Sequence, residues 1–202
     1  MSGATLLLAA GAGTRFGSDK RLALTSTGLP LLAATIARYA CLGWPIYIVI
    51  RPEDSDLPER IRRDLHGTTE AARLHWVVAV DAHLGMGHSL RAGVDALLDD
   101  GFTEALVGLG DMPYVRAATL RSLQLLLLES ASADLLARPR HQSRPGNPVG
   151  FSHTQLRKLV HLSGDVGARQ LLQQQHSHVT WLEVDDPGVL QDVDRPEDLL
   201  GH

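Results

Sequence analysis

Short apolar runs alternate with stretches of helical periodicity along almost the whole chain. Continuous apolar runs are typical of strands that are buried on both faces of a sheet. The predicted strands are Thr5–Ala10, Ile46–Ile50, Leu74–Val80, Ala105–Leu109, Asp134–Ala137, Pro148–Phe151 and Val179–Val184. The predicted helices are Pro30–Tyr39, Glu59–Leu65, Ser89–Leu98, Ala117–Ser130, His153–Leu162 and Val166–Gln175, with a turn at Gly85–His88 and a proline-rich, cationic loop at Arg138–Asn147. This alternation predicts an α/β fold of three layers, with a mostly parallel, doubly wound, Rossmann-like sheet.

Length and composition narrow the class of protein. At 202 residues the chain suits one domain, residues 1–202, with a full hydrophobic core. A net charge of −4 argues against a nucleic-acid partner, whose phosphates favour a basic face. The single cysteine permits no internal disulfide, no stretch is long and apolar enough for a membrane span, and the apolar start lacks the basic residues of a signal peptide. We therefore expect a cytoplasmic protein without a membrane partner.

The segment that follows the first predicted strand carries the strongest functional signal. It contains Gly11, Gly13 and Gly17 together with two cations, Arg15 and Lys20. Glycines let backbone N–H groups approach an anion closely, and the two cations supply a planar fork and a point charge for phosphates. The pattern predicts a nucleoside triphosphate site, in which we expect Lys20 to be an exposed loop cation.

Two familiar phosphate-binding loops do not fit this segment. The dinucleotide pattern G-x-G-x-x-G fails because Phe16 stands where the third glycine belongs. The P-loop pattern fails because no Gly-Lys-Ser or Gly-Lys-Thr is present in the segment.

Seven motifs along the chain form an ordered set. They are Leu8–Lys20, Gly28–Leu32, Gly85–Leu90, Leu109–Pro113, Arg144–Phe151, Gly164–Arg169 and Asp192–Leu199. Their order and sequence resemble those of the nucleotidyltransferases that share the fold of the molybdenum-cofactor nucleotidyltransferases. The resemblance covers nearly the whole chain and implies a sheet of the nucleotide-diphospho-sugar transferase type.

The resemblance also implies roles for individual residues. The catalytic cations would be Arg15 and Lys20. The nucleotide-binding residues would be Leu8, Ala9, Ala10, Gly11, Gly13, Arg15, Lys20, Ser89 and Gly110. The acceptor-binding residues would be Asn147, Pro148 and Asp165.

Nucleotidyl transfer needs a divalent cation, Mg²⁺ or Mn²⁺, because charge builds on the phosphate oxygens as pyrophosphate leaves. Asp111, at the end of a predicted strand, is the first candidate ligand; its alternative is a turn or capping aspartate. The resemblance implies Asp194 as a second ligand. Arg195 replaces the family's usual threonine, Asp192 lies close enough to compete, and Asp194 could also cap a helix that begins at Pro196.

The choice of base follows from two motifs. Ala9-Ala10-Gly11 and Gly110-Asp111-Met112-Pro113 resemble the cytidylyl enzymes of the family rather than the guanylyl enzymes. A methyl group at Ala10 would narrow the floor beneath the base and favour a pyrimidine. The resemblance therefore implies CTP as the nucleotide substrate, the terminal phosphate of molybdopterin as acceptor, and a recipient molybdoenzyme of the xanthine dehydrogenase type.

Three alternatives stay open. The chain could be a guanylyltransferase of the same pathway, or a transferase acting on another small phosphate such as a sugar phosphate or methylerythritol phosphate. A non-catalytic pterin carrier or chaperone is the alternative from another class. Retention of Arg15, Lys20, Asp111 and Asp194 argues against the carrier, which needs no triphosphate or metal. Asn147 stands where the family often has a histidine.

Overall fold

The computed structural model describes residues 3–11, 16–65, 73–161 and 179–200. Its centre is an eight-stranded sheet. Four strands, in the order β3-β2-β1-β4, run parallel to one another: β1 (Gly3–Leu8), β2 (Ile46–Ile50), β3 (Leu74–Val78) and β4 (Glu104–Leu109). Leu8 is in register with both Val49 and Leu109, so β1, β2 and β4 end at the same edge of the sheet.

The remaining strands make the sheet mixed. β7 (Val149–Phe151) is antiparallel to both β4 and β5 (Leu136–His141). β6 (Arg144–Pro145) is antiparallel to β5, whereas β8 (Val179–Glu183) is parallel to it. The prediction of a mostly parallel sheet is confirmed, with a reversed strand inserted between β4 and β5.

The predicted loop at Arg138–Asn147 is wrong over most of its length. Residues 138–141 belong to β5, and Gln142 and Ser143 form a two-residue turn with φ of 49° and 63°. Both φ values are typical of a tight hairpin turn, but that turn usually contains glycine or asparagine. A proline and two arginines within β5 further hid the strand, because prolines are rare inside sheets.

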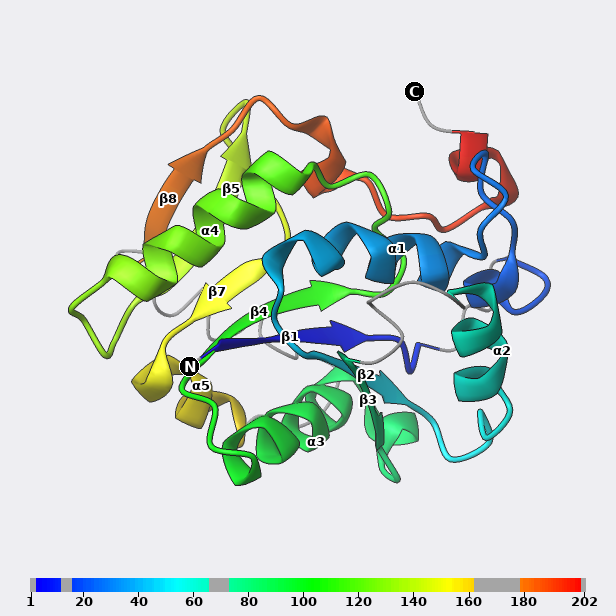
Figure 1. Cartoon of the computed structure of the whole chain (residues 1–202), viewed down its shortest axis with the longest axis horizontal. Helices are drawn as coiled ribbons and strands as arrows, with labels where there is room; N and C mark the ends of the chain where they lie inside the picture. The colour runs from blue at the N-terminus through cyan, green and yellow to red at the C-terminus, as the bar shows by residue number, and fades with distance from the viewer. Residues whose placement is uncertain (1–2, 12–15, 66–72, 162–178, 201–202) are drawn as a thin grey trace.

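Helices cover both faces of the sheet, as Figure 1 shows. α1 (Leu31–Tyr39) and α4 (Ala117–Glu129) lie on one face, and α3 (Met86–Asp99) and α5 (His153–Leu159) lie on the other. α2 (Leu57–Asp64) packs with α1, and short 3-10 helices occupy Lys20–Leu22, Ala40–Leu42, Ala82–Leu84, Pro187–Leu190 and Pro196–Leu200. The three-layer α/β prediction is therefore confirmed.

One predicted helix starts earlier in the structure, and another lies beyond the part of the chain that the structure describes. α3 begins at Met86, three residues earlier than predicted, because only Gly85 of the expected turn adopts a positive φ, of 122°. The predicted helix at Val166–Gln175 lies outside the described residues.

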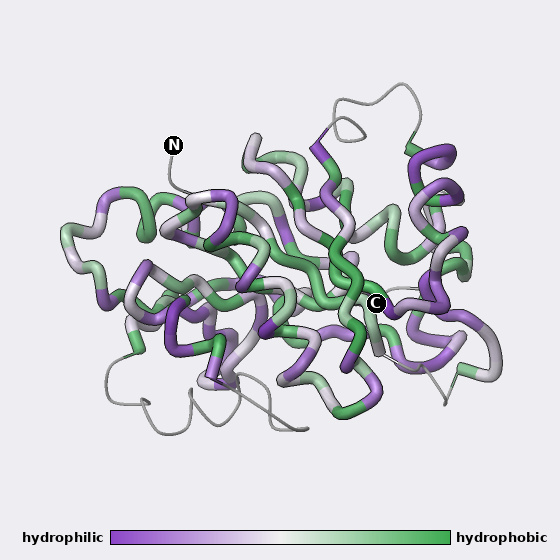
Figure 2. Tube along the Cα trace, turned by 90° about the horizontal axis from the view of Figure 1, so that it is seen from below, coloured by the Kyte–Doolittle hydropathy of each residue, from purple (hydrophilic) through white to green (hydrophobic). Residues whose placement is uncertain are grey.

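Alternating side chains of β1 and of the two residues after it contribute to both halves of the core. Leu7 and Ala9 pack on the α1 side, while Ala4, Leu6 and Ala10 pack on the α3 side. Hydrophobic segments run through the middle of the molecule in Figure 2, and most hydrophilic segments lie at its periphery. Within the described ranges, no helix combines the length and the apolar character needed to cross a membrane.

Candidate functional site

A cleft of about 650 Å³ opens where β1, β2 and β4 end. Ligands in sheets of this kind bind beyond the carboxyl ends of the strands. The sequence-predicted nucleotide and metal residues that the structure describes all line this cleft: Leu8, Ala9, Ala10, Gly11, Lys20, Ser89, Gly110, Asp111 and Asp194. Parallel register brings together the residues at or just beyond the strand ends. Ser89 comes from the first turn of α3, Lys20 from the 3-10 helix Lys20–Leu22, and Asp194 from the C-terminal segment, residues 191–200.

The other predicted residues divide into two groups. Gly13, Arg15 and Asp165 lie outside the described residues. Asn147 and Pro148 directly precede β7 and lie close to the carboxyl end of β4, because Val149 pairs with Val107. Neither residue is part of the cleft lining; Pro148 is buried, and the Asn147 backbone N–H donates to the Val189 carbonyl at 2.8 Å.

Lys20 is the centre of the charged wall of the cleft. Its Nζ donates to Asp111 Oδ2 at 2.7 Å, to the Val193 carbonyl at 2.8 Å and to Asp194 Oδ1 at 3.1 Å. The side chain is only 14% exposed, so the prediction of an exposed loop cation is wrong. Its partners stand 91 and 174 positions away in the sequence, and local pattern could not reveal them.

Backbone contacts hold the C-terminal segment against Asp111. The N–H of the fully buried Val193 donates to the Asp111 carbonyl at 3.0 Å. Asp198 Oδ2 accepts from the backbone N–H groups of Asp194 and Arg195, so at the start of the last 3-10 helix the carboxylate that binds backbone N–H groups is that of Asp198. Asp194 keeps its own carboxylate turned toward Lys20.

Burial and neighbouring charges shift the pKa values of Asp111 and Lys20 in opposite directions. Burial raises the pKa of Asp111, and the hydrogen bond and positive charge of Lys20 offset this rise only in part. For Lys20, burial alone would lower the pKa, but the bonds to Asp111 and Asp194 outweigh it and raise the pKa above the usual 10.5. Lys20 therefore stays charged at neutral pH, while the ionised form of Asp111 is under electrostatic strain that a cation would relieve.

The same wall suits a divalent cation. Asp111 Oδ1 is buried and has no hydrogen-bond partner among the described residues. The described ranges contain no cluster of three or more histidine, cysteine or acidic residues able to hold a metal by themselves. One or two carboxylates, completed by phosphate oxygens and waters, are the set that Mg²⁺ prefers. Asp111 and Asp194 fit this set; Asp192 is exposed and lines the same cleft.

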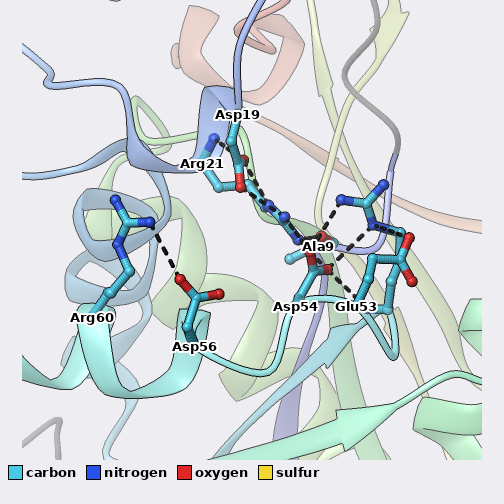
Figure 3. A network of polar contacts seen from close by, with 8 residues as sticks. Ala9, Asp19, Arg21, Glu53, Asp54, Asp56 and Arg60 are labelled. Atoms are coloured by element: carbon cyan, nitrogen blue, oxygen red, sulfur yellow. Dashed lines mark hydrogen bonds and ion pairs between the residues drawn. The ribbon is translucent and has the colours of Figure 1, made fainter.

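Sequence reasoning missed one buried cation, Arg21. It lies directly after Lys20 and is bound to Asp19, Asp54 and the Ala9 carbonyl (Figure 3). Asp54 follows β2, 33 positions further along, so the pairing has no local signal.

A sequence model described as the MobA-like NTP transferase domain matches residues 5–179. This range includes Asp111 and the glycine segment, residues 11–20. The chain belongs to the MobA-like NTP transferase family. Members of this family are nucleotidyltransferases, and the cleft, the glycine segment and the Lys20 wall are consistent with that activity.

Individual relatives of this MobA-like chain agree with the family assignment. Purine catabolism protein PucB of Bacillus subtilis is 31% identical over 195 residues, covering 96% of the chain and 92% of PucB. Bifunctional protein GlmU of Jannaschia sp. is 34% identical over 159 residues, which are 78% of the chain but only 33% of GlmU. The chain thus spans about a third of GlmU and nearly the whole of PucB.

Several solved structures superpose on the chain over nearly its whole length. Rv0371c of Mycobacterium tuberculosis superposes with a TM-score of 0.77 at 27% identity, covering 100% of the chain and 98% of Rv0371c. A manganese complex of the same protein superposes with a TM-score of 0.71 at 25% identity, covering 98% and 96%. A nucleotidyl transferase from Methanothermobacter, at 21% identity and a TM-score of 0.74, shares the fold.

Proposed function

We propose that this MobA-like nucleotidyltransferase transfers CMP from CTP to the terminal phosphate of molybdopterin and releases pyrophosphate, with Mg²⁺ or Mn²⁺. The observation that carries the proposal is the Lys20–Asp111–Asp194 wall beside the glycine segment. A wall of one ammonium and two carboxylates can hold a triphosphate and a cation together. The relative crystallised with manganese supports the choice of a divalent ion.

The chemistry needs little from side chains beyond charge and position. An oxygen of the acceptor phosphate, already anionic at neutral pH, forms a bond to the α-phosphorus in line with the bridging oxygen that leaves with pyrophosphate. No general base is needed. A cation held by Asp111 and Asp194 would neutralise the charge that builds on the phosphate oxygens.

Lys20 would assist the leaving pyrophosphate. Three acceptors already surround its ammonium group, so binding a phosphate oxygen requires it to release one of them. The contact to Asp194 is the longest at 3.1 Å, and the Asp194 side chain is 44% exposed. Exchange of Asp194 for phosphate is therefore the smallest change at the Lys20 ammonium group, and it removes the Lys20 contact from a carboxylate that would hold the cation.

The choice of CTP rests on the residues beside the base. Ala10 lines the cleft just after β1, is only 8% exposed, and packs against the core on the α3 side. Ser89, 5% exposed, lies in the first turn of α3 and offers a hydroxyl at the same cleft. The name of PucB, purine catabolism protein, supports a recipient molybdoenzyme of the xanthine dehydrogenase type.

The experiment is a transfer assay with α-labelled CTP and GTP in parallel, with and without molybdopterin. We expect labelled molybdopterin and an equal amount of pyrophosphate from CTP, dependent on both molybdopterin and Mg²⁺. Preference for GTP would assign the chain to guanylyl transfer. Label passing instead to a sugar phosphate or methylerythritol phosphate would contradict the acceptor, and pterin binding without pyrophosphate release would indicate a carrier.

Ala10→Gly tests the proposed origin of base choice. Removing the methyl group should raise the use of GTP relative to CTP without abolishing the use of CTP. One methyl group in a pocket is worth roughly 1–3 kcal/mol of discrimination, so the switch should be partial. Ratios of kcat/KM for the two nucleotides measure it, and an unchanged ratio in the variant would remove Ala10 from base selection.

A further inference from the structure

Arg21 uses its whole guanidinium group in hydrogen bonds. Nε and Nη2 donate to the two carboxylate oxygens of Asp19, both at 2.8 Å. Nη1 and Nη2 donate to the two carboxylate oxygens of Asp54 at 2.5 and 2.6 Å. The fifth bond runs from Nη1 to the Ala9 carbonyl at 3.0 Å. Figure 3 shows the side chain reaching from Asp19 to Asp54, with Ala9 beside them.

The three acceptors belong to three different parts of the fold. Ala9 lies at the end of β1, directly before the glycine segment begins. Asp19 lies at the other end of that segment and accepts from the Arg21 backbone N–H as well. Asp54 follows β2 and also binds Arg51, which lines the cleft. One guanidinium group thus ties Ala9, at the end of β1, to Asp19, beside Lys20, and both to Asp54 after β2.

This ion pair lies in an interior where charge is costly. The side chains of Arg21 and Asp54 are 7% and 6% exposed. Well-packed apolar residues often replace a buried ion pair with no loss of stability, so stability alone is a weak reason for its presence. Its geometry supplies what apolar residues cannot: directional bonds to a backbone carbonyl and to two carboxylates at fixed angles.

We infer that Arg21, clamped by Asp54, is a positioning residue that holds its neighbour Lys20 and the backbone at Ala9 in place on the wall of the cleft that would bind a triphosphate. Arg21 acts through its neighbour Lys20 and through the end of β1. The inference rests on the cleft being the nucleotide site. It concerns the β- and γ-phosphates, because these are the groups that Lys20 would hold.

Arg21→Lys and Arg21→Met test this role by titration with CTP and CMP in the presence of Mn²⁺, with thermal unfolding recorded for each variant. Lysine keeps the charge but cannot bind three acceptors in a fork. Small displacements of binding groups greatly weaken binding. We therefore expect both variants to weaken CTP binding at least about tenfold, while CMP binding changes much less. The ratio of the two affinities is the readout, since loss of folded protein would lower both affinities equally.

Arg60→Met is the matched control. Arg60 forms an exposed ion pair with Asp56 at the start of α2, also drawn in Figure 3, and it does not line the cleft. We expect its CTP to CMP ratio to equal that of the wild type. A wild-type ratio in Arg21→Lys, or parallel losses for both nucleotides in both Arg21 variants, would overturn the positioning role. The readout is binding, so absent transfer to molybdopterin would contradict the proposed function without changing this comparison.

Discussion

At the scale of single residues, Lys20 takes part both in contacts that hold the fold together and in the proposed reaction. Its ammonium group binds both Asp111 and Asp194, which come from different parts of the chain, and offsets one of their two negative charges. In Lys20→Met the two carboxylates lose their shared ammonium and the Val193 carbonyl loses its donor. We expect turnover to fall by orders of magnitude and the free energy of unfolding at neutral pH to fall by about 1–3 kcal/mol. Added Mn²⁺ should stabilise the variant more than the wild type, because it replaces the missing cation.

Thermal unfolding with and without Mn²⁺, together with pyrophosphate release, measures both effects. Lys158→Met provides the control, since Lys158 forms a more exposed ion pair with Asp134 on the surface. Near-normal turnover in Lys20→Met would remove Lys20 from the mechanism.

Asp54 should make the stability of the protein depend on pH in the acid range. Burial alone would raise its pKa, but bonds from Arg21 and Arg51 outweigh burial and hold the pKa well below the usual 3.8. The stabilisation from this carboxylate is therefore complete above pH 3.8 and is lost as the pH falls further toward the folded-state pKa. Asp54→Asn should cost about 3–5 kcal/mol at neutral pH, because it breaks a buried pair.

Urea unfolding of wild type and Asp54→Asn at a series of pH values checks the sign. The difference in free energy of unfolding should narrow as the pH falls below 3.8. If this difference does not change with pH, the charge of the Asp54 carboxylate contributes nothing to the free energy of unfolding.

At the scale of elements, Asp186 fixes the start of α4. Its Oδ2 accepts from the Arg116 backbone N–H at 2.9 Å and from Thr119 Oγ1 at 2.6 Å, and its Oδ1 accepts from the Gly188 backbone N–H at 3.0 Å. A buried anion at a helix N-terminus also interacts favourably with the helix dipole. Asp186→Asn should lower the free energy of unfolding by about 1–3 kcal/mol.

Chemical denaturation measures that loss, and CTP titration provides the contrast. Asp186 does not line the cleft, so nucleotide affinity should stay at the wild-type value. A large loss of CTP affinity in this variant would mean that α4 and the cleft are coupled.

Apolar patterning predicted the elements well where the strands are buried on both faces. Strands β1, β2 and β4 and helices α1 and α4 lie within a few residues of their predicted ranges. The pattern failed at β5, where Arg138, Pro139 and Arg140 resemble a loop, and at the first turn of α3, where Gly87 and His88 hide a helix start. In both places long-range pairing or packing outweighed local preference.

At the scale of the whole molecule, parallel topology accounts for the position of the site. Strands that end at one edge bring Gly11, Asp54 and Asp111 together, and this edge could be predicted from an alternating α/β sequence. The C-terminal segment then returns to lie beside the segment after β1 (Figure 1), which places Asp194 against Lys20. The sequence could indicate each charged residue separately, but the burial of Lys20 and the Arg21–Asp54 pair depend on contacts between distant segments.

The most direct measurement is pyrophosphate release from CTP with molybdopterin at increasing Mg²⁺, in wild type and Asp111→Asn. Release by the wild type should require Mg²⁺ or Mn²⁺. The variant should need far more metal and turn over more slowly, because it loses a carboxylate ligand. Its free energy of unfolding should change little, since burial already raises the pKa of Asp111 and the ionised carboxyl adds little stability. Metal-independent release, or wild-type turnover and metal dependence in Asp111→Asn, would contradict a metal-assisted nucleotidyl transfer at this cleft.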